Sequence, residues 1–175
     1  MNPKIQITKT ELLSDNWYLL NKVTYEFTPQ NGEPEIQRRE VYDRGNGAAI
    51  LLYNREKQTV ILTRQFRLPT FLNGNESGMM IEVCAGLLDE KNPEDCIKRE
   101  TEEETGLSAV HVEVLGTLPQ YITGTQFFIT PVVALVRPGF TLQPNPHEVD
   151  DVFEVPLDFL MDPLNHRRHA MEWNG

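Results

Sequence analysis

The stretch that decides the fold of this chain is short and acidic: Arg99-Glu100-Thr101-Glu102-Glu103-Glu104-Thr105-Gly106-Leu107. It forms the second half of a predicted helix. Asn92 suits the N-cap, Pro93 suits the first helical position, and Gly106 suits the stop. We therefore predict a helix that begins after Asn92 and ends before Gly106.

Three of these carboxylates share one helix face. Glu100, Glu103 and Glu104 stand at i, i+3 and i+4, whereas Glu102 projects elsewhere. Like charges at this spacing cost an isolated helix roughly 0.2–0.5 kcal/mol per pair. A divalent cation would reverse the sign, because Mg²⁺ binds through carboxylates together with water and substrate phosphates.

The competing interpretation is a helix whose acidic face is simply solvated. Three features favour a metal site instead. The cluster lies at the C-terminal end of the helix, where the dipole disfavours anions; Arg99 adjoins it; and a glycine loop, Ala85-Gly86, precedes the helix. We therefore interpret the acidic face as a metal site.

The remainder of the chain is rich in strand patterns. Apolar and alternating runs predict strands at 17–28, 35–42, 48–53, 59–63, 79–84, 110–118, 127–136 and 149–155, with a short helix at 156–161. Strands on both sides of a central helix predict an α/β fold in which a mixed sheet packs between helices.

Length and composition narrow the class of protein. The 175 residues, 39% hydrophobic and 24% charged, suit one globular domain. A formal net charge of −10 argues against nucleic acid or an anionic membrane as partner, so a phosphate-bearing ligand would need a cation. The chain has no long apolar span and no apolar signal-peptide core, so we expect a cytoplasmic protein. Cys84 and Cys96 fit that compartment as reduced packing residues.

The acidic helix and the glycine before it resemble the Nudix box of the Nudix hydrolases. The residues that carry the resemblance are Gly86-Leu87-Leu88, Arg99-Glu100, Glu103-Glu104 and Gly106-Leu107. It implies a Nudix fold, an α/β/α sandwich with an N-terminal strand extension. It also implies a diphosphatase that uses Mg²⁺, with Mn²⁺ as a substitute.

The match to the box has three departures. Gly86 lies one residue too close to Arg99, and Thr101 replaces an apolar residue. The first glutamate of the box falls on Lys91 or Asn92. Because that glutamate mainly organises the loop in the family, we expect its absence to weaken loop rigidity more than metal binding.

The resemblance also implies roles for single residues. The implied metal ligands are Ala85, through its carbonyl, and Glu100, Glu103, Glu104 and Glu148; the implied catalytic carboxylates are Glu103, Glu104 and Glu148. We prefer Glu148 as the general base and keep Glu103 as the alternative. Asp150 and Asp151 lie close enough in sequence to substitute for Glu148.

Within the family, residues 1 to about 107 resemble the GDP-mannose pyrophosphatase branch, through 13–17, 39–47, 64–67 and 73–78. The implied substrate-binding residues are Trp17, Arg38, Arg39, Glu40, Arg67, Ala85, Gly86 and Leu87. An aromatic ring can stack on a base, and arginine binds phosphate oxygens in pairs. The branch implies a homodimer with exchanged N-terminal strands. We therefore expect residues 1–45 to serve dimerisation and substrate binding, and residues 46–175 to form the hydrolase domain.

The last third, residues about 127 to 175, resembles the coenzyme A diphosphatase branch instead, through 128–135 and 145–157. The first branch has an acidic loop residue that 121–126 lack, and the second has a motif ahead of the box that is missing here. A lineage that mixes features and a composite sequence both stay open, and the polar end suggests truncation.

These resemblances lead to one expected function with two alternatives. We expect Mg²⁺-dependent cleavage of a nucleoside-diphosphate sugar to nucleoside monophosphate and sugar 1-phosphate. The alternatives are a coenzyme A or ADP-ribose diphosphatase, and a catalytically impaired Nudix-fold protein that only binds a nucleotide.

Overall fold

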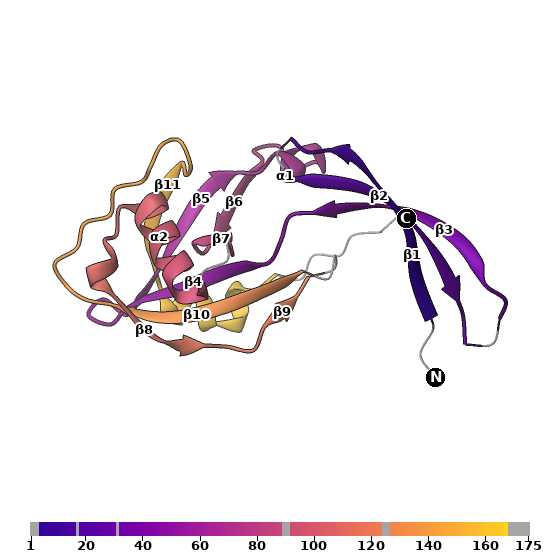
Figure 1. The fold of residues 1–175 in the computed structure, drawn as a ribbon. Coiled ribbons are helices and arrows are strands. Elements are labelled where there is room, and N and C mark those ends of the chain that lie inside the picture. Colours follow the sequence, from indigo (N-terminus) through magenta and orange to yellow (C-terminus); the bar gives the residue numbers. More distant parts are fainter. Residues whose placement is uncertain (1–3, 17, 31, 89–91, 124–126, 168–175) are drawn as a thin grey trace. The chain divides into compact units, whose positions relative to one another are not determined.

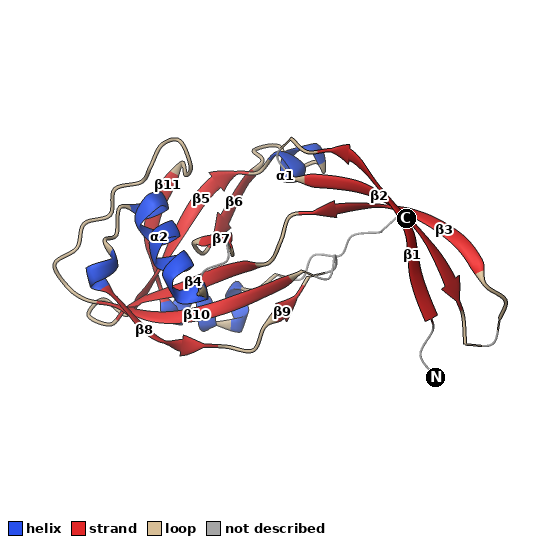
Figure 2. Ribbon diagram, viewed as in Figure 1, coloured by secondary structure: helices blue, strands red, loops and turns tan. Residues whose placement is uncertain are grey.

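The computed structural model describes residues 4–16, 18–30, 32–88, 92–123 and 127–167 of the chain (Figure 1). The chain divides into two compact units, Met1–Gly45 and Asn46–Gly175. Each unit contains its own β-sheet (Figure 2).

The first unit is a three-stranded antiparallel sheet in the order β1-β2-β3. Its strands are β1 (Lys4–Ser14), β2 (Leu19–Thr28) and β3 (Glu35–Asp43). The second and third strands confirm the predictions for 17–28 and 35–42, whereas β1 was missed. No described residue of this unit is buried, so a ladder of backbone hydrogen bonds rather than a core holds the strands together.

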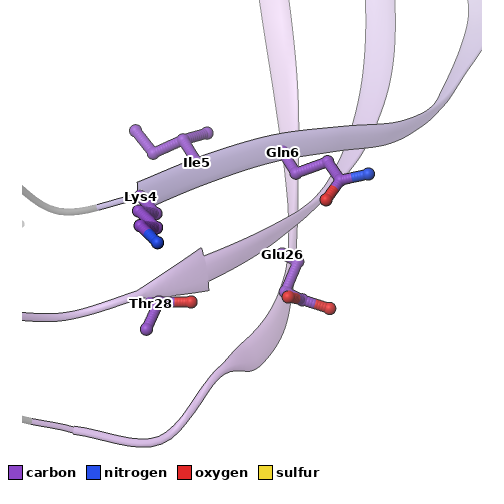
Figure 3. A pocket seen from close by; sticks show the side chains of 5 residues that line it. All are labelled: Lys4, Ile5, Gln6, Glu26 and Thr28. Atoms are coloured by element: carbon purple, nitrogen blue, oxygen red, sulfur yellow. The ribbon is translucent and has the colours of Figure 1, made fainter.

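A surface pocket of about 410 Å³ lies on this sheet (Figure 3). Lys4, Ile5 and Gln6 of β1 line it together with Glu26 and Thr28 of β2. None of the residues predicted for the active site belongs to it.

The second unit is built on a mixed eight-stranded sheet in the order β11-β5-β4-β10-β8, with β6, β7 and β9 paired to β5, β4 and β10. The pairing of β10 with β4 is parallel, and the other pairings are antiparallel. The mixed sheet predicted from the sequence is confirmed. The strands are β4 (Gly47–Asn54), β5 (Thr59–Phe66), β6 (Met79–Glu82), β7 (Ala85–Leu87), β8 (Val112–Thr117), β9 (Tyr121–Ile122), β10 (Phe128–Val136) and β11 (Asp151–Pro156).

The main helix of this unit is α2 (Pro93–Thr105), which packs against β4, β7 and β10 (Figure 1). Its bounds confirm the prediction. The Asn92 side chain accepts a hydrogen bond from the backbone N–H of Glu94, and Gly106 ends the helix at φ 68°. The other helical segments are α1 (Leu68–Leu72), α3 (Leu157–Met161) and the 3₁₀ turns Ala109–His111 and Pro163–Asn165.

The core lies between α2 and the sheet. Alternate residues of β4 and β10, among them Ile50, Leu52 and Val132, join Ile97 of α2 in one buried cluster. Cys84 and Cys96 are buried, in keeping with the expected packing role. Among the described residues, no helix combines the length and the apolar composition needed to span a bilayer.

One local prediction was wrong. The expected glycine loop at Ala85-Gly86 is instead the strand β7, which pairs with Ala48 and Ala49 of β4. Three residues are too few for a periodic pattern, so only the pairing with β4 identifies this strand.

Candidate active site

Helix α2 distributes its acidic side chains between the protein interior and solvent. Glu104 is 7% exposed, the Glu100 side chain 19% and the Glu103 side chain 45%. The sequence placed the three on one face because of their spacing, but the sheet covers only one edge of that face. The structure thereby separates the buried Glu104 from the exposed Glu103.

Arg99 holds the two more exposed carboxylates. Its Nη2 lies 2.7 Å from Oε1 of Glu100, and its Nη1 lies 2.7 Å from Oε2 of Glu103. Glu103 also lines a surface pocket of about 490 Å³ on the outer side of α2. The other lining residues are Asp95, Lys98, Arg99, Glu102 and Ala109.

Glu104 is the most perturbed carboxylate. Burial raises its pKa from 4.5 to about 7, although a hydrogen bond from the buried Cys84 thiol lowers that pKa. The negative charges of Glu100 and Glu148 raise the pKa further. Its Oε2 is buried and has no hydrogen-bond partner among the described residues. A half-satisfied buried carboxylate of this kind is costly unless a cation or a proton completes it.

Glu100 is accommodated by the absence of a side chain on β7. A Cβ placed on Gly86 would lie 2.3 Å from Cδ of Glu100, so any other residue at this position would displace the Glu100 side chain. Burial raises the pKa of Glu100; Arg99 lowers it, and Glu103 and Glu148 raise it. The net pKa shift is upward.

Glu148 reaches this cluster from a loop much later in the chain. The loop is exposed, but the charge of Glu148 acts on both Glu100 and Glu104. Its two predicted substitutes are engaged elsewhere. Asp150 accepts a 3.0 Å hydrogen bond from Nε of Arg64, and Asp151 accepts one from the N–H of Val152.

Arg67 adds a positive charge to the same region. Its Nε lies 2.8 Å from Oε2 of Glu82, and its charge lowers the pKa of Glu104. The structure therefore brings Arg67 together with the acids at the end of α2. Ala85, Gly86 and Leu87 form β7 beside α2. Arg38, Arg39 and Glu40 lie exposed on β3 of the other unit, and Trp17 lies outside the described residues.

The residues at the end of α2 fit a hard divalent cation in their chemistry. Glu100 and Glu104 offer carboxylate oxygens, the donor type that Mg²⁺ prefers, and Oε2 of Glu104 lacks a partner. Within the described ranges, however, no three His, Cys, Asp or Glu side chains are already gathered as a ligand set. The third donor is therefore the least defined part of the predicted site.

The sequence analysis missed three residues that support these groups. Cys84 contacts Glu104, Glu82 holds Arg67, and Asn145 joins the main chains of Glu104 and Glu148. No spacing pattern could have identified them, because Cys84, Glu82 and Asn145 each meet a partner that lies far away in the sequence, and only the folded chain brings the two together.

Family comparisons divide the chain close to the boundary between the two units. Residues 4–42 match the GDP-mannose pyrophosphatase NudK N-terminal domain, and residues 43–173 match the NUDIX domain. The second match confirms the resemblance that the acidic helix suggested.

Curated relatives carry the name GDP-mannose pyrophosphatase. The protein of Citrobacter koseri is 57% identical over 118 residues, which are 67% of this chain and 62% of that protein. The protein of Pectobacterium atrosepticum is 57% identical over 115 residues, or 66% and 60%. The protein of Enterobacter sp. is 47% identical over 168 residues, or 94% and 87%. The chain thus spans about 60% of the first two relatives and most of the third.

Solved structures share the fold at low identity. A crystal structure of an ADP compounds hydrolase has a TM-score of 0.54 at 19% identity and covers 91% of this chain and 84% of its own. A C. elegans Ap4A hydrolase binary complex has a TM-score of 0.52 at 14% identity and covers 65% and 81%. The NUDIX match covers most of the chain, and the Enterobacter relative is similar over nearly all of it. The chain therefore belongs to the Nudix hydrolase family.

Proposed function

We propose that this protein hydrolyses the diphosphate bond of a nucleoside-diphosphate sugar such as GDP-mannose, giving a nucleoside monophosphate and a sugar 1-phosphate. The observation that carries the proposal is Glu104, a buried carboxylate with an unpartnered oxygen beside Glu100 and within the field of Glu148 and Arg67. The relatives named GDP-mannose pyrophosphatase support the choice of substrate.

Nudix hydrolases generally use divalent metal ions. We assign Mg²⁺, with Mn²⁺ as a substitute, to Glu100, Glu104 and Glu148 together with the Ala85 carbonyl. There the ion would act as a Lewis acid toward the diphosphate and acidify water. Glu103 is the weakest member of the predicted ligand set, because it is exposed and already paired with Arg99.

Side chains of the protein would supply the other two roles, charge stabilisation and proton transfer. The Arg67 guanidinium, held by Glu82, faces phosphate oxygens and balances the charge that develops on them. Glu148 accepts the proton of the attacking water, since it is exposed enough to meet that water. Glu103 remains the alternative base.

We assign substrate binding and dimerisation to residues 1–45, and hydrolysis to residues 46–175. Trp17, Arg38, Arg39 and Glu40 would contact the nucleotide sugar in a homodimer. Exposed isoleucines of the first sheet support association, because a second copy could cover them. These are Ile5, Ile7 and Ile36.

We place the enzyme in the cytoplasm, without nucleic-acid or membrane partners. Two buried cysteines that are not joined as a disulfide suit a reducing compartment, and the net charge of −10 disfavours binding to polyanions.

A panel of diphosphates tests the function. With Mg²⁺ and chromatographic separation of the phosphomonoester products, GDP-mannose should be cleaved faster than ADP-ribose or coenzyme A. Coenzyme A cleaved fastest would favour the branch that residues 145–157 resemble. Thermal stabilisation by Mg²⁺ and GDP-mannose without product would identify a nucleotide-binding protein.

Glu104→Gln tests the metal site within the same assay. We expect turnover to fall by at least about a hundredfold, because the substitution removes a metal ligand. The matched control is Glu102→Gln, which makes the same change at an exposed position of the same helix and should retain normal turnover. Normal turnover in Glu104→Gln would remove the metal site from the proposal.

A further inference from the structure

The C-terminal end of α2 is closed by a segment almost forty residues later, as the residue numbers show. The last carbonyls of a helix have no partner within the helix. Here Asn145 N–H donates to the Glu104 carbonyl at 3.1 Å, and Gln143 N–H donates to the Thr105 carbonyl at 2.8 Å. A Cβ on Gly106 would lie 2.9 Å from the Gln143 carbonyl oxygen, so the glycine permits this approach.

Asn145 also shapes the turn that carries Glu148. Its carbonyl accepts from Glu148 N–H at 3.0 Å and from Val149 N–H at 2.9 Å. Its side-chain Oδ1 accepts from His147 N–H at 3.2 Å. Val149 is 2% exposed, so the far end of the turn is anchored in the core. One residue therefore connects the main chain of Glu104 to that of Glu148.

We propose that Asn145 is a positioning residue that holds the Glu148 carboxylate beside Glu100 and Glu104. This proposal rests on the proposed function. The Asn145 side chain caps the turn, and without it His147 N–H loses its acceptor and the turn can open. Pro144 and Pro146 on either side have fixed φ angles. The Asn145 side chain is therefore the part of this segment that a substitution can remove without changing the neighbouring backbone angles.

The test compares three variants of the full chain with GDP-mannose and Mg²⁺. We expect Asn145→Ala to lower kcat about tenfold with little change in KM, because the base is displaced rather than the substrate. Asn145→Ser should restore most of kcat, since its hydroxyl can also accept from the N–H two residues on. Gln143→Ala is the matched control and should behave as the native chain, because the exposed Gln143 side chain has no role in the turn.

A double-mutant cycle separates positioning from a merely structural effect. In a Glu148→Gln background, Asn145→Ala should change kcat by less than about twofold, because there is no carboxylate left to position. An equal loss of kcat in both backgrounds would overturn the proposal. So would a fall in Tm with native kcat.

A second readout does not need turnover. The affinity of the substrate-free protein for Mn²⁺, measured by electron paramagnetic resonance, should be about threefold or more weaker in Asn145→Ala than in the native chain. In the Glu148→Gln background, adding Asn145→Ala should leave the Mn²⁺ affinity unchanged. If the native chain cleaves no diphosphate, the proposed function fails while this readout still decides the role of Asn145. Unchanged Mn²⁺ affinity in Asn145→Ala would then contradict it.

Discussion

The two units of this chain differ in whether they bury a hydrophobic core. The unit Asn46–Gly175 buries a contiguous cluster of side chains between α2 and its sheet, whereas none of the described residues of Met1–Gly45 is buried. A small sheet without an apolar face against a core is only marginally stable. Stability should therefore reside in the second unit.

The carboxylates of the two units differ in the same way. Glu104 of the second unit has its pKa raised by burial. Glu11 of the first unit is partly exposed, and a hydrogen bond from Lys9, with the charge of that lysine, lowers its pKa. Burial thus creates chemically unusual acids in the second unit, whereas the described acid Glu11 of the first unit shows the modest effect of a surface pair.

The largest expected effect concerns packing. Ile97→Ala should lower the free energy of unfolding by about 2–5 kcal/mol, because Ile97 is fully buried. Ile7→Ala, the same substitution at a side chain 65% exposed, should change it by less than about 0.5 kcal/mol. Urea denaturation at a protein concentration that keeps the chain monomeric measures both, and equal losses would break the comparison.

The next effect concerns pH. Because the pKa of folded Glu104 is about 7 and its ordinary pKa is 4.5, the native chain takes up a proton that the unfolded chain still lacks. Stability of the metal-free protein should therefore rise by up to about 3 kcal/mol as pH falls from about 8 to 5.

Two variants test whether Glu104 causes this rise in stability. Tm should rise much less in Glu104→Gln, with Glu100 supplying the remainder, since its pKa is also raised. Glu11→Gln in the first unit is the control and should keep the full rise. Below pH 5, Glu154 affects stability in the opposite direction. Burial raises its pKa, but hydrogen bonds from Lys57, Thr59 and Asn54 outweigh burial and lower it. The stability that ionised Glu154 contributes is therefore lost when acid protonates it. An unchanged rise in Glu104→Gln would contradict the assignment.

The smallest expected effect tests whether the first unit binds substrate while the second unit carries out hydrolysis. Arg39→Ala should raise KM for GDP-mannose about tenfold, because it removes a proposed contact to the substrate. It should leave kcat and Tm unchanged, because Arg39 hydrogen-bonds only to Arg38 and Gln37 within the described part of the chain. Arg55→Ala, an exposed arginine of the second unit, is the matched control. A loss of kcat instead would mean that the first unit takes part in the chemistry.

Local patterns predicted the elements whose causes are local. The bounds of α2 follow from Asn92, Pro93 and Gly106, which act within one turn of the helix ends. The strands β1 and β7 were missed for opposite reasons. β1 buries nothing, so burial gives it no clear pattern, and β7 is too short to show one.

By itself, the sequence determined the helix, its acidic face and the family, because capping and i, i+3, i+4 spacing need no knowledge of distant residues. Only the tertiary structure decided that Glu104 is buried while Glu103 faces solvent, and that Asn145 joins the end of α2 to the turn of Glu148. The physical reason is that burial and desolvation depend on which remote segments pack together, and those contacts determine the charge that each carboxylate can bear.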